Sequence, residues 1–203
     1  MSIRVMIVED QAMVRGALTA LLTLEPELEI VAECADAESA LAVLDSSAPD
    51  IVLMDVELPG MNGIEAIGAI TRLRPATKSL VLTTFGRPGY LRTALDSGAV
   101  GFLVKDAPAT ELAAAIRKVY AGGRAIDPDL AMAALALGPN PLTPRQRDIL
   151  RLTRLGRSVA EMAQQLFLSE GTVRNYISEA IAVTGGSNRF EATRIAEANG
   201  WLG

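Results

Sequence analysis

Short apolar runs alternate with amphipathic segments along the first 120 or so residues of the chain. Helical periodicity separates the runs, as in MVRGALTALLTL (13–24) and in ATELAAAIRKVY (109–120), which a Gly-Gly pair terminates. Regular alternation of this kind predicts a doubly wound α/β fold with a five-stranded parallel sheet. Five runs have the length and β-branched content of buried strands: residues 3–8, 29–34, 51–54, 80–83 and 101–104.

The pattern changes after residue 121, and no strand is expected beyond it. Asp127 and Pro128 predict the start of a short helix in a linker over 122–141. Thr143 with Gln146, and Ser158 with Glu161, form capping-box patterns, which predict helix starts. We therefore expect an α/β domain over 1–121 and an all-α domain over 142–203 whose four helices run over about 144–155, 159–166, 170–183 and 189–199.

The second and third of these helices are joined by a tight link, which predicts a helix-turn-helix. Val173, Ile177, Ala180 and Ile181 share one side of the third helix and predict its core face, while Glu179 is among the residues that face away. The second helix of such a motif enters the major groove of DNA with its early residues at the bases. We therefore expect four DNA-binding residues: Thr172 at a phosphate, and Arg174, Asn175 and Ser178 at base edges.

Charge is unevenly divided between the two parts. Residues 1–140 carry 11 Lys and Arg against 18 Asp and Glu, whereas residues 141–203 carry 8 Arg against 6 acids. Only the second part therefore has the charge balance that favours nucleic acid. No apolar run reaches the length of a membrane span and the N-terminus lacks a signal-peptide layout, so we expect a cytoplasmic protein with no direct membrane insertion.

Functional side chains follow the predicted strands at the ends where parallel strands present their chemistry. Glu9 and Asp10 follow the first strand, Asp55 the third, Thr83 ends the fourth and Lys105 follows the fifth. Three carboxylates repel one another, and a hard divalent cation with oxygen ligands relieves that repulsion, so the sequence predicts a magnesium site. A carboxylate beside a metal ion, a lysine and a hydroxyl is suited to accepting a phosphoryl group on Asp55.

The chain has no histidine, which excludes Ser-His-Asp and Cys-His nucleophile systems. It also means that a histidine-borne phosphoryl group must come from another molecule.

The motifs VEDQ (8–11), Asp55 followed by LPGMNG, Thr83, and Lys105 preceded by Phe102 resemble the receiver domain of two-component response regulators. The resemblance covers about residues 2–121 and implies a flavodoxin-like fold. It implies a sensor histidine kinase as partner, for which we expect a membrane-bound protein, and a switching role for Thr83 and Phe102. We add Val56, directly after Asp55, to the expected magnesium ligands.

Residues 142–203 resemble the DNA-binding domain of the NarL/FixJ (LuxR-type) regulators through LTPRQRDILRL, AQQLFLSEGTVRNYI and NRFEA. TTFGRPGYL, GTVRNYIS and the NGW ending are similar to the DesR-like branch. The resemblance implies promoter DNA as a partner and a homodimer formed on phosphorylation. We expect that dimer to use the first and fifth helices, with the fourth helix and fifth strand as the competing surface.

The leading interpretation is a transcription factor switched by phosphorylation, and not an enzyme beyond the phosphotransfer at Asp55. One alternative is a phosphatase of the haloacid-dehalogenase type, which also attacks with an aspartate. Such enzymes need a second aspartate two residues on, where this chain has Glu57. The other alternative is a constitutive DNA-binding protein with an inactive receiver.

Overall fold

The computed structural model describes residues 2–84, 88–106, 108–136 and 140–202. The chain divides into two compact units, the first made of residues 1–86 with 91–133 and the second chiefly of residues 134–203. Among the described residues, no helix has the length and apolar character needed to cross a membrane.

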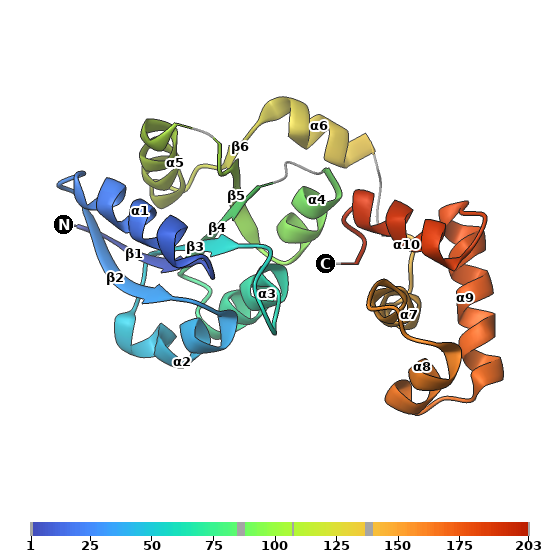
Figure 1. Ribbon diagram of the computed structural model, residues 1–203. Coiled ribbons are helices and arrows are strands. Elements are labelled where there is room, and N and C mark those ends of the chain that lie inside the picture. The colour runs from blue at the N-terminus through green and yellow to red at the C-terminus, as the bar shows by residue number, and fades with distance from the viewer. Residues whose placement is uncertain (1, 85–87, 107, 137–139, 203) are drawn as a thin grey trace. The chain divides into compact units, whose positions relative to one another are not determined.

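A parallel sheet forms the centre of the first unit, with its strands in the order β2-β1-β3-β4-β5-β6 (Figure 1). Five of its strands are the predicted ones, and the expectation of a five-stranded sheet is corrected by the sixth, which lies in the predicted linker. Two residues are too short to carry an alternating pattern, so no periodicity could reveal this strand. The strands are β1 Ile3–Val8, β2 Leu28–Cys34, β3 Ile51–Asp55, β4 Lys78–Thr83, β5 Ala99–Val104 and β6 Ala125–Ile126.

Helices cover both faces of this sheet (Figure 1). On one face α1 and α5 pack on alternate strand residues, with Leu22 and Ile116 against Ile7, Leu53 and other apolar side chains. On the other face lie α2 and α3 (Figure 1), and β3 is buried along its whole length, as expected of a strand between two helical layers. The helices of the described residues up to 136 are α1 Ala12–Thr23, α2 Ala37–Ser47, α3 Gly63–Leu73, α4 Pro88–Asp96, α5 Ala109–Tyr120 and α6 Pro128–Ala136.

Residues 140–202 of the second unit form four helices, α7 Pro144–Arg154, α8 Val159–Leu166, α9 Glu170–Thr184 and α10 Arg189–Ala198. Both predicted capping boxes are present, at the start of α7 and of α8, because each cap hydroxyl and the side chain three residues later satisfy backbone N–H groups that the helix leaves open. Val173 and Ile177 of α9 pack with Ile149 and Met162 of the neighbouring helices. This packing fixes α9 through one face and leaves the opposite face outward.

The turn between α8 and α9 contains a feature that the sequence pattern does not reveal. Phe167 has a left-handed backbone, with φ of 57°, and its side chain is 94% exposed. The N–H of Leu168 donates to the carbonyl of Ala163 at 2.9 Å, which closes the helix end in the way that usually employs glycine. A phenylalanine at this position therefore has neither packing nor backbone preference in its favour.

Gly63, the first residue of α3, allows the backbone to pass very close to the end of β3. A Cβ atom at this position would lie 1.8 Å from the carbonyl oxygen of Asp55. We expect Gly63→Ala to lower the free energy of unfolding by about 3 kcal/mol or more, because two main-chain segments would have to separate. Urea denaturation followed by circular dichroism measures the change.

Gly68→Ala is the matched control in the same helix. A Cβ at Gly68 meets only the end of the Arg72 side chain, at 3.5 Å. Alanine is the better helix former, so we expect this change to raise stability by up to about 1 kcal/mol. Equal effects of the two substitutions would show that the close approach to Asp55 has no energetic weight.

Candidate functional site

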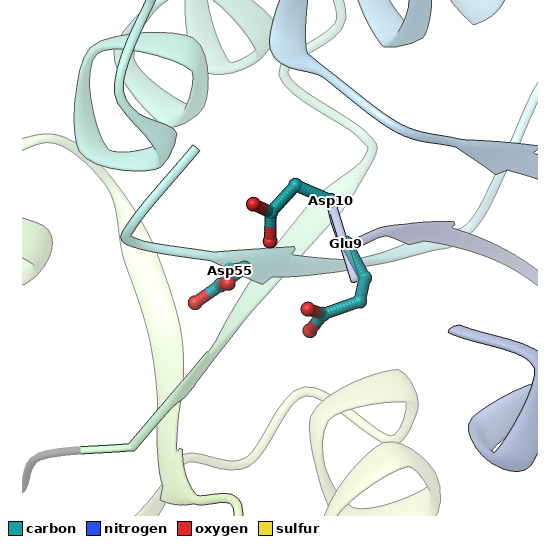
Figure 2. Close-up of side chains that lie close together, drawn as sticks. All are labelled: Glu9, Asp10 and Asp55. Carbon is teal, nitrogen blue, oxygen red and sulfur yellow. The ribbon is translucent and has the colours of Figure 1, made fainter. Parts of the chain in front are cut away.

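Three carboxylates meet at the end of the sheet where β1 and β3 stop. Asp55 is the last residue of β3 and is 3% exposed, Glu9 follows β1 and is 1% exposed, and Asp10 is exposed to solvent. One carboxylate oxygen from each residue lies within 4.8 Å of the others, and Figure 2 shows the three side chains gathered at the ends of the two strands. Strand order explains this, because β1 and β3 are direct neighbours in the sheet.

Lys105 supplies the positive charge that these carboxylates need. Its Nζ lies 2.6 Å from Oε2 of Glu9 and 2.8 Å from Oδ2 of Asp55, and its side chain is 12% exposed. The backbone N–H of Lys105 donates to the carbonyl of Thr83 at 2.8 Å, which fixes the point where the lysine leaves β5. Thr83 itself is buried at the end of β4. The predicted set Glu9, Asp10, Asp55, Thr83 and Lys105 therefore occupies one edge of the sheet.

Burial and charge act on the ionisable groups of this site in opposite directions. Burial raises the pKa of the Glu9 carboxyl and the charge of Asp55 adds to that effect, while the hydrogen bond and charge of Lys105 oppose it. For Lys105, burial lowers the pKa, but its bonds to Asp55 and Glu9 outweigh burial and leave the pKa above its ordinary value. One ammonium group thus faces three carboxylates, and an excess of negative charge remains.

Backbone contacts hold the acidic residues in place. The guanidinium of Arg15 donates to the carbonyl of Glu9 at 2.6 Å, and the N–H of Gln11 donates to Oε1 of Glu9 at 3.2 Å. The N–H of Glu57 donates to Oδ1 of Asp55 at 3.3 Å. Nothing in the sequence pattern singles out Arg15, since an arginine early in a helix is ordinarily a surface charge.

The all-oxygen character of the site fits a hard divalent cation such as magnesium. Besides the three carboxylates, the carbonyl of Val56 is available; this residue is buried and its carbonyl accepts one hydrogen bond, from the N–H of Gly63 at 3.2 Å. A carbonyl oxygen has a second lone pair, so this bond leaves room for a ligand.

Phe102 lies in the interior of β5 and not at the acidic edge, by which we mean the end of the sheet that carries Glu9, Asp10 and Asp55. It is buried, and its backbone pairs with Val81 on β4 and with Ile126 on β6. The residue proposed as a switch is therefore flanked on one side by the strand that carries Thr83 and on the other by the segment expected to be the linker.

The exposed face of α9 carries the side chains predicted to meet DNA. Arg174, Asn175 and Ser178 are exposed, and Thr172 is half-buried beside the helix cap, its hydroxyl 2.8 Å from that of Ser169. Val173, Ile177 and Ala180 are buried on the opposite face, as predicted, and Ile181 is partly buried there. The helix thus has a buried apolar face and an exposed polar face.

Two contacts of α9 were not predictable from its pattern. Arg174 Nη2 lies 2.6 Å from Oε2 of Glu170, one turn earlier in the helix. Glu179, expected simply to face away, is exposed but accepts a hydrogen bond at 3.1 Å from Nε2 of Gln146, the buried capping residue of α7. Its carboxylate is therefore partly engaged within the unit.

Two protein families match the chain. The response regulator receiver domain matches residues 5–117, and the luxR family of bacterial regulatory proteins matches residues 140–196. These segments contain the acidic edge and the α8–α9 pair, respectively.

Relatives are similar over nearly the whole length of the chain. The transcriptional regulatory proteins YvfU and DesR of Bacillus subtilis are 42% and 41% identical, over 98% of this chain and 100% and 99% of their own lengths. Among solved structures, the response regulator ChrA of a heme-sensing two-component system is 30% identical, covers 98% of both chains and has a TM-score of 0.58.

Replacing Lys105 by methionine tests its role in compensating the buried carboxylates. We expect a loss of about 3–5 kcal/mol in the free energy of unfolding, because Glu9 and Asp55 lose their shared cation. The folded-state pKa of Glu9 is already raised; without Lys105 it rises further. The folded state then binds protons more strongly than the unfolded state, so the variant loses stability as pH rises above the ordinary pKa of glutamate.

Urea denaturation of wild type and Lys105→Met at pH 5 and pH 8, with a chelator present, measures this dependence. The difference in stability between the two proteins should be larger at pH 8. A difference that does not change with pH would mean that Glu9 is not the group that Lys105 keeps ionised.

Proposed function

The chain belongs to the response regulators that join a receiver domain to a LuxR-family DNA-binding domain, and we propose that it is a transcriptional regulator activated by phosphorylation of Asp55. The observation that carries this proposal is the buried Asp55 carboxylate, which shares the ammonium group of Lys105 with Glu9. The Asp55 carboxylate can act as a nucleophile there, and the Lys105 ammonium beside it can neutralise an incoming phosphoryl group.

The phosphoryl donor is a phosphohistidine of a sensor kinase, which we expect to be membrane-bound. An oxygen of Asp55 forms the new bond to phosphorus as the bond from phosphorus to the histidine nitrogen breaks. Lys105 holds one phosphoryl oxygen by charge and the hydroxyl of Thr83 holds another. Glu9, Asp10, Asp55 and the Val56 carbonyl would bind magnesium, which supplies further charge neutralisation.

Phosphorylation replaces a singly charged carboxylate by a more highly charged and larger group at a buried edge. Lys105 then has a second acceptor beside Glu9, and Thr83 and Phe102 adjust to it. The buried environment of Thr83 and Phe102 supports this role, since neither can change position without repacking its neighbours.

The proposed output is a homodimer, and the outward face of α1 supports it. Met13, Ala17, Ala20 and Leu21 are all exposed, and Arg15 is the only charged residue of the helix. An exposed helix face so poor in charge is suited to contact with another protein. Leu112 and Ile116 of α5 are buried against the sheet, so only the exposed flank of α5 is available to extend that contact.

Arg174, Asn175 and Ser178 on α9 would read promoter DNA while Thr172 contacts a phosphate, and we place this activity in the cytoplasm. The phosphatase alternative is not favoured, because the matched families are those of a receiver and a DNA-binding domain and the position of the second aspartate is Glu57. The constitutive alternative predicts that Asp55→Ala binds promoter DNA as tightly as phosphorylated wild type.

The first test concerns the phosphoacceptor. Wild type incubated with a radiolabelled phosphorylated histidine kinase should gain label only with magnesium present. Asp55→Asn should gain none, because an amide does not attack phosphorus, while Glu57→Gln should retain labelling. Labelling of Asp55→Asn to the wild-type level would contradict the assignment.

A second test concerns the dimer. Ala17→Glu adds a charge to the outward face of α1, and we expect it to keep the phosphorylated protein monomeric in sedimentation velocity while leaving phosphorylation intact. Asp96→Lys, at an exposed position of α4 on the competing surface, is the matched control and should still dimerise. Loss of the dimer in the control alone would assign the contact to α4 and β5 instead.

A further inference from the structure

The helix proposed to enter the major groove begins with an acidic residue. Glu170 is the first residue of α9, directly after the cap Ser169. The early residues of a recognition helix are those nearest the bases, so this carboxylate approaches the phosphates of any DNA that the helix enters. A negative charge there lowers affinity for all DNA alike, and the four-helix part has little positive charge to offset it.

Stabilisation of the helix N-terminus does not explain why a glutamate stands at position 170. Ser169 already caps the helix, since its hydroxyl accepts from the N–H of Thr172 at 3.1 Å. An acidic residue in the first turn of an exposed helix end adds only a small further stabilisation. This small stabilisation does not offset the loss of DNA affinity, so a further role of Glu170 must lie in its side-chain contacts.

The structure supplies one through Arg174. Oε2 of Glu170 lies 2.6 Å from Nη2 of Arg174, although both side chains are about half exposed or more, at 48% and 62%. Among the residues described, Glu170 is the only hydrogen-bond or ion-pair partner of the Arg174 guanidinium. The hydroxyl of Ser178, one turn later, donates to the main-chain carbonyl of Arg174 and so does not hold the side chain.

A guanidinium group has five donors, so a carboxylate at Nη2 leaves enough of them for a guanine, which arginine recognises through O6 and N7. An arginine side chain has many rotamers, and fixing it before DNA arrives reduces the entropy lost on binding. We propose that Glu170 is a positioning residue: it holds Arg174 in the orientation that reads a guanine, while its charge weakens binding to all DNA, so that only DNA with this base recovers affinity through Arg174. The proposal rests on the proposed function, in which Arg174 is a reader.

Opposite effects on two kinds of DNA distinguish this role from a merely structural ion pair. The probes are a duplex selected from a random-sequence pool by phosphorylated wild type and an unselected duplex of the same length. Glu170→Ala should bind the unselected duplex more tightly, because a negative charge is gone. Its preference for the selected duplex should fall by about tenfold, within the discrimination of a bidentate arginine–guanine contact.

Glu170→Gln separates orientation from charge. Its amide oxygen can still accept from Arg174, so we expect most of the preference to remain while affinity for the unselected duplex rises. A thermal melt of each variant checks folding, and an exposed pair of this spacing should contribute too little to unfold the domain.

Arg174→Ala and the double variant complete the test. If Glu170 acts through Arg174, selection with Glu170→Ala relaxes the same base position as Arg174→Ala, and the double variant relaxes nothing more. Loss of preference in Arg174→Ala but not in Glu170→Ala would overturn only the positioning role. Relaxation of a separate cytosine by Glu170→Ala would also overturn it, because the carboxylate would then be a reader itself. An unchanged preference in Arg174→Ala would instead remove Arg174 as a reader.

Discussion

The ion pairs from Lys105 to Glu9 and Asp55 are the constraint on which the first unit depends. They join residues at the ends of β1, β3 and β5, and they place an ammonium group where two nearly buried carboxylates would otherwise face each other. Neither carboxylate could remain charged there at reasonable cost without this cation. The strand order brings these residues to one edge, and so the topology of the sheet and the chemistry of the site have the same origin.

That arrangement also determines which segments respond structurally to a new charge at Asp55. Lys105 is bonded through its backbone to Thr83 on β4, and three residues earlier β5 carries Phe102. Phe102 in turn pairs through its backbone with Ile126 of β6, the short strand of the linker segment. In the proposed function, a phosphoryl group on Asp55 attracts Lys105, and any resulting shift of β5 is transmitted to β6 through the pairing of these strands. These strands form a continuous path, and energetic coupling between distant segments can be carried by contiguous contacts of this kind.

The sequence predicts well those features that local chemistry determines. Asp55 follows a short apolar run and Thr143 precedes Gln146 by a capping-box interval, and both patterns have one favoured structure. It predicts poorly the features that depend on contacts between distant segments. β6 is stabilised by β5 and not by its own two residues, and Gln146 bonds Glu179 only because α7 and α9 pack together. The left-handed Phe167 shows the same limit, since glycine would be the expected residue.

Most arginines of the second unit are paired with carboxylates, so the positive charge available for DNA phosphates is smaller than the number of arginines suggests. Of the eight arginines in residues 141–203, six form ion pairs with acidic residues of the same segment: Arg145, Arg151, Arg154, Arg157, Arg174 and Arg194. Exposed pairs contribute little stability, so they can be exchanged for phosphate contacts, but each exchange leaves a carboxylate beside the DNA. One copy of this unit therefore has a small electrostatic gain on any DNA. In the proposed function, specific base contacts and the effective concentration within a dimer supply the rest, so that a change in self-association would switch DNA binding.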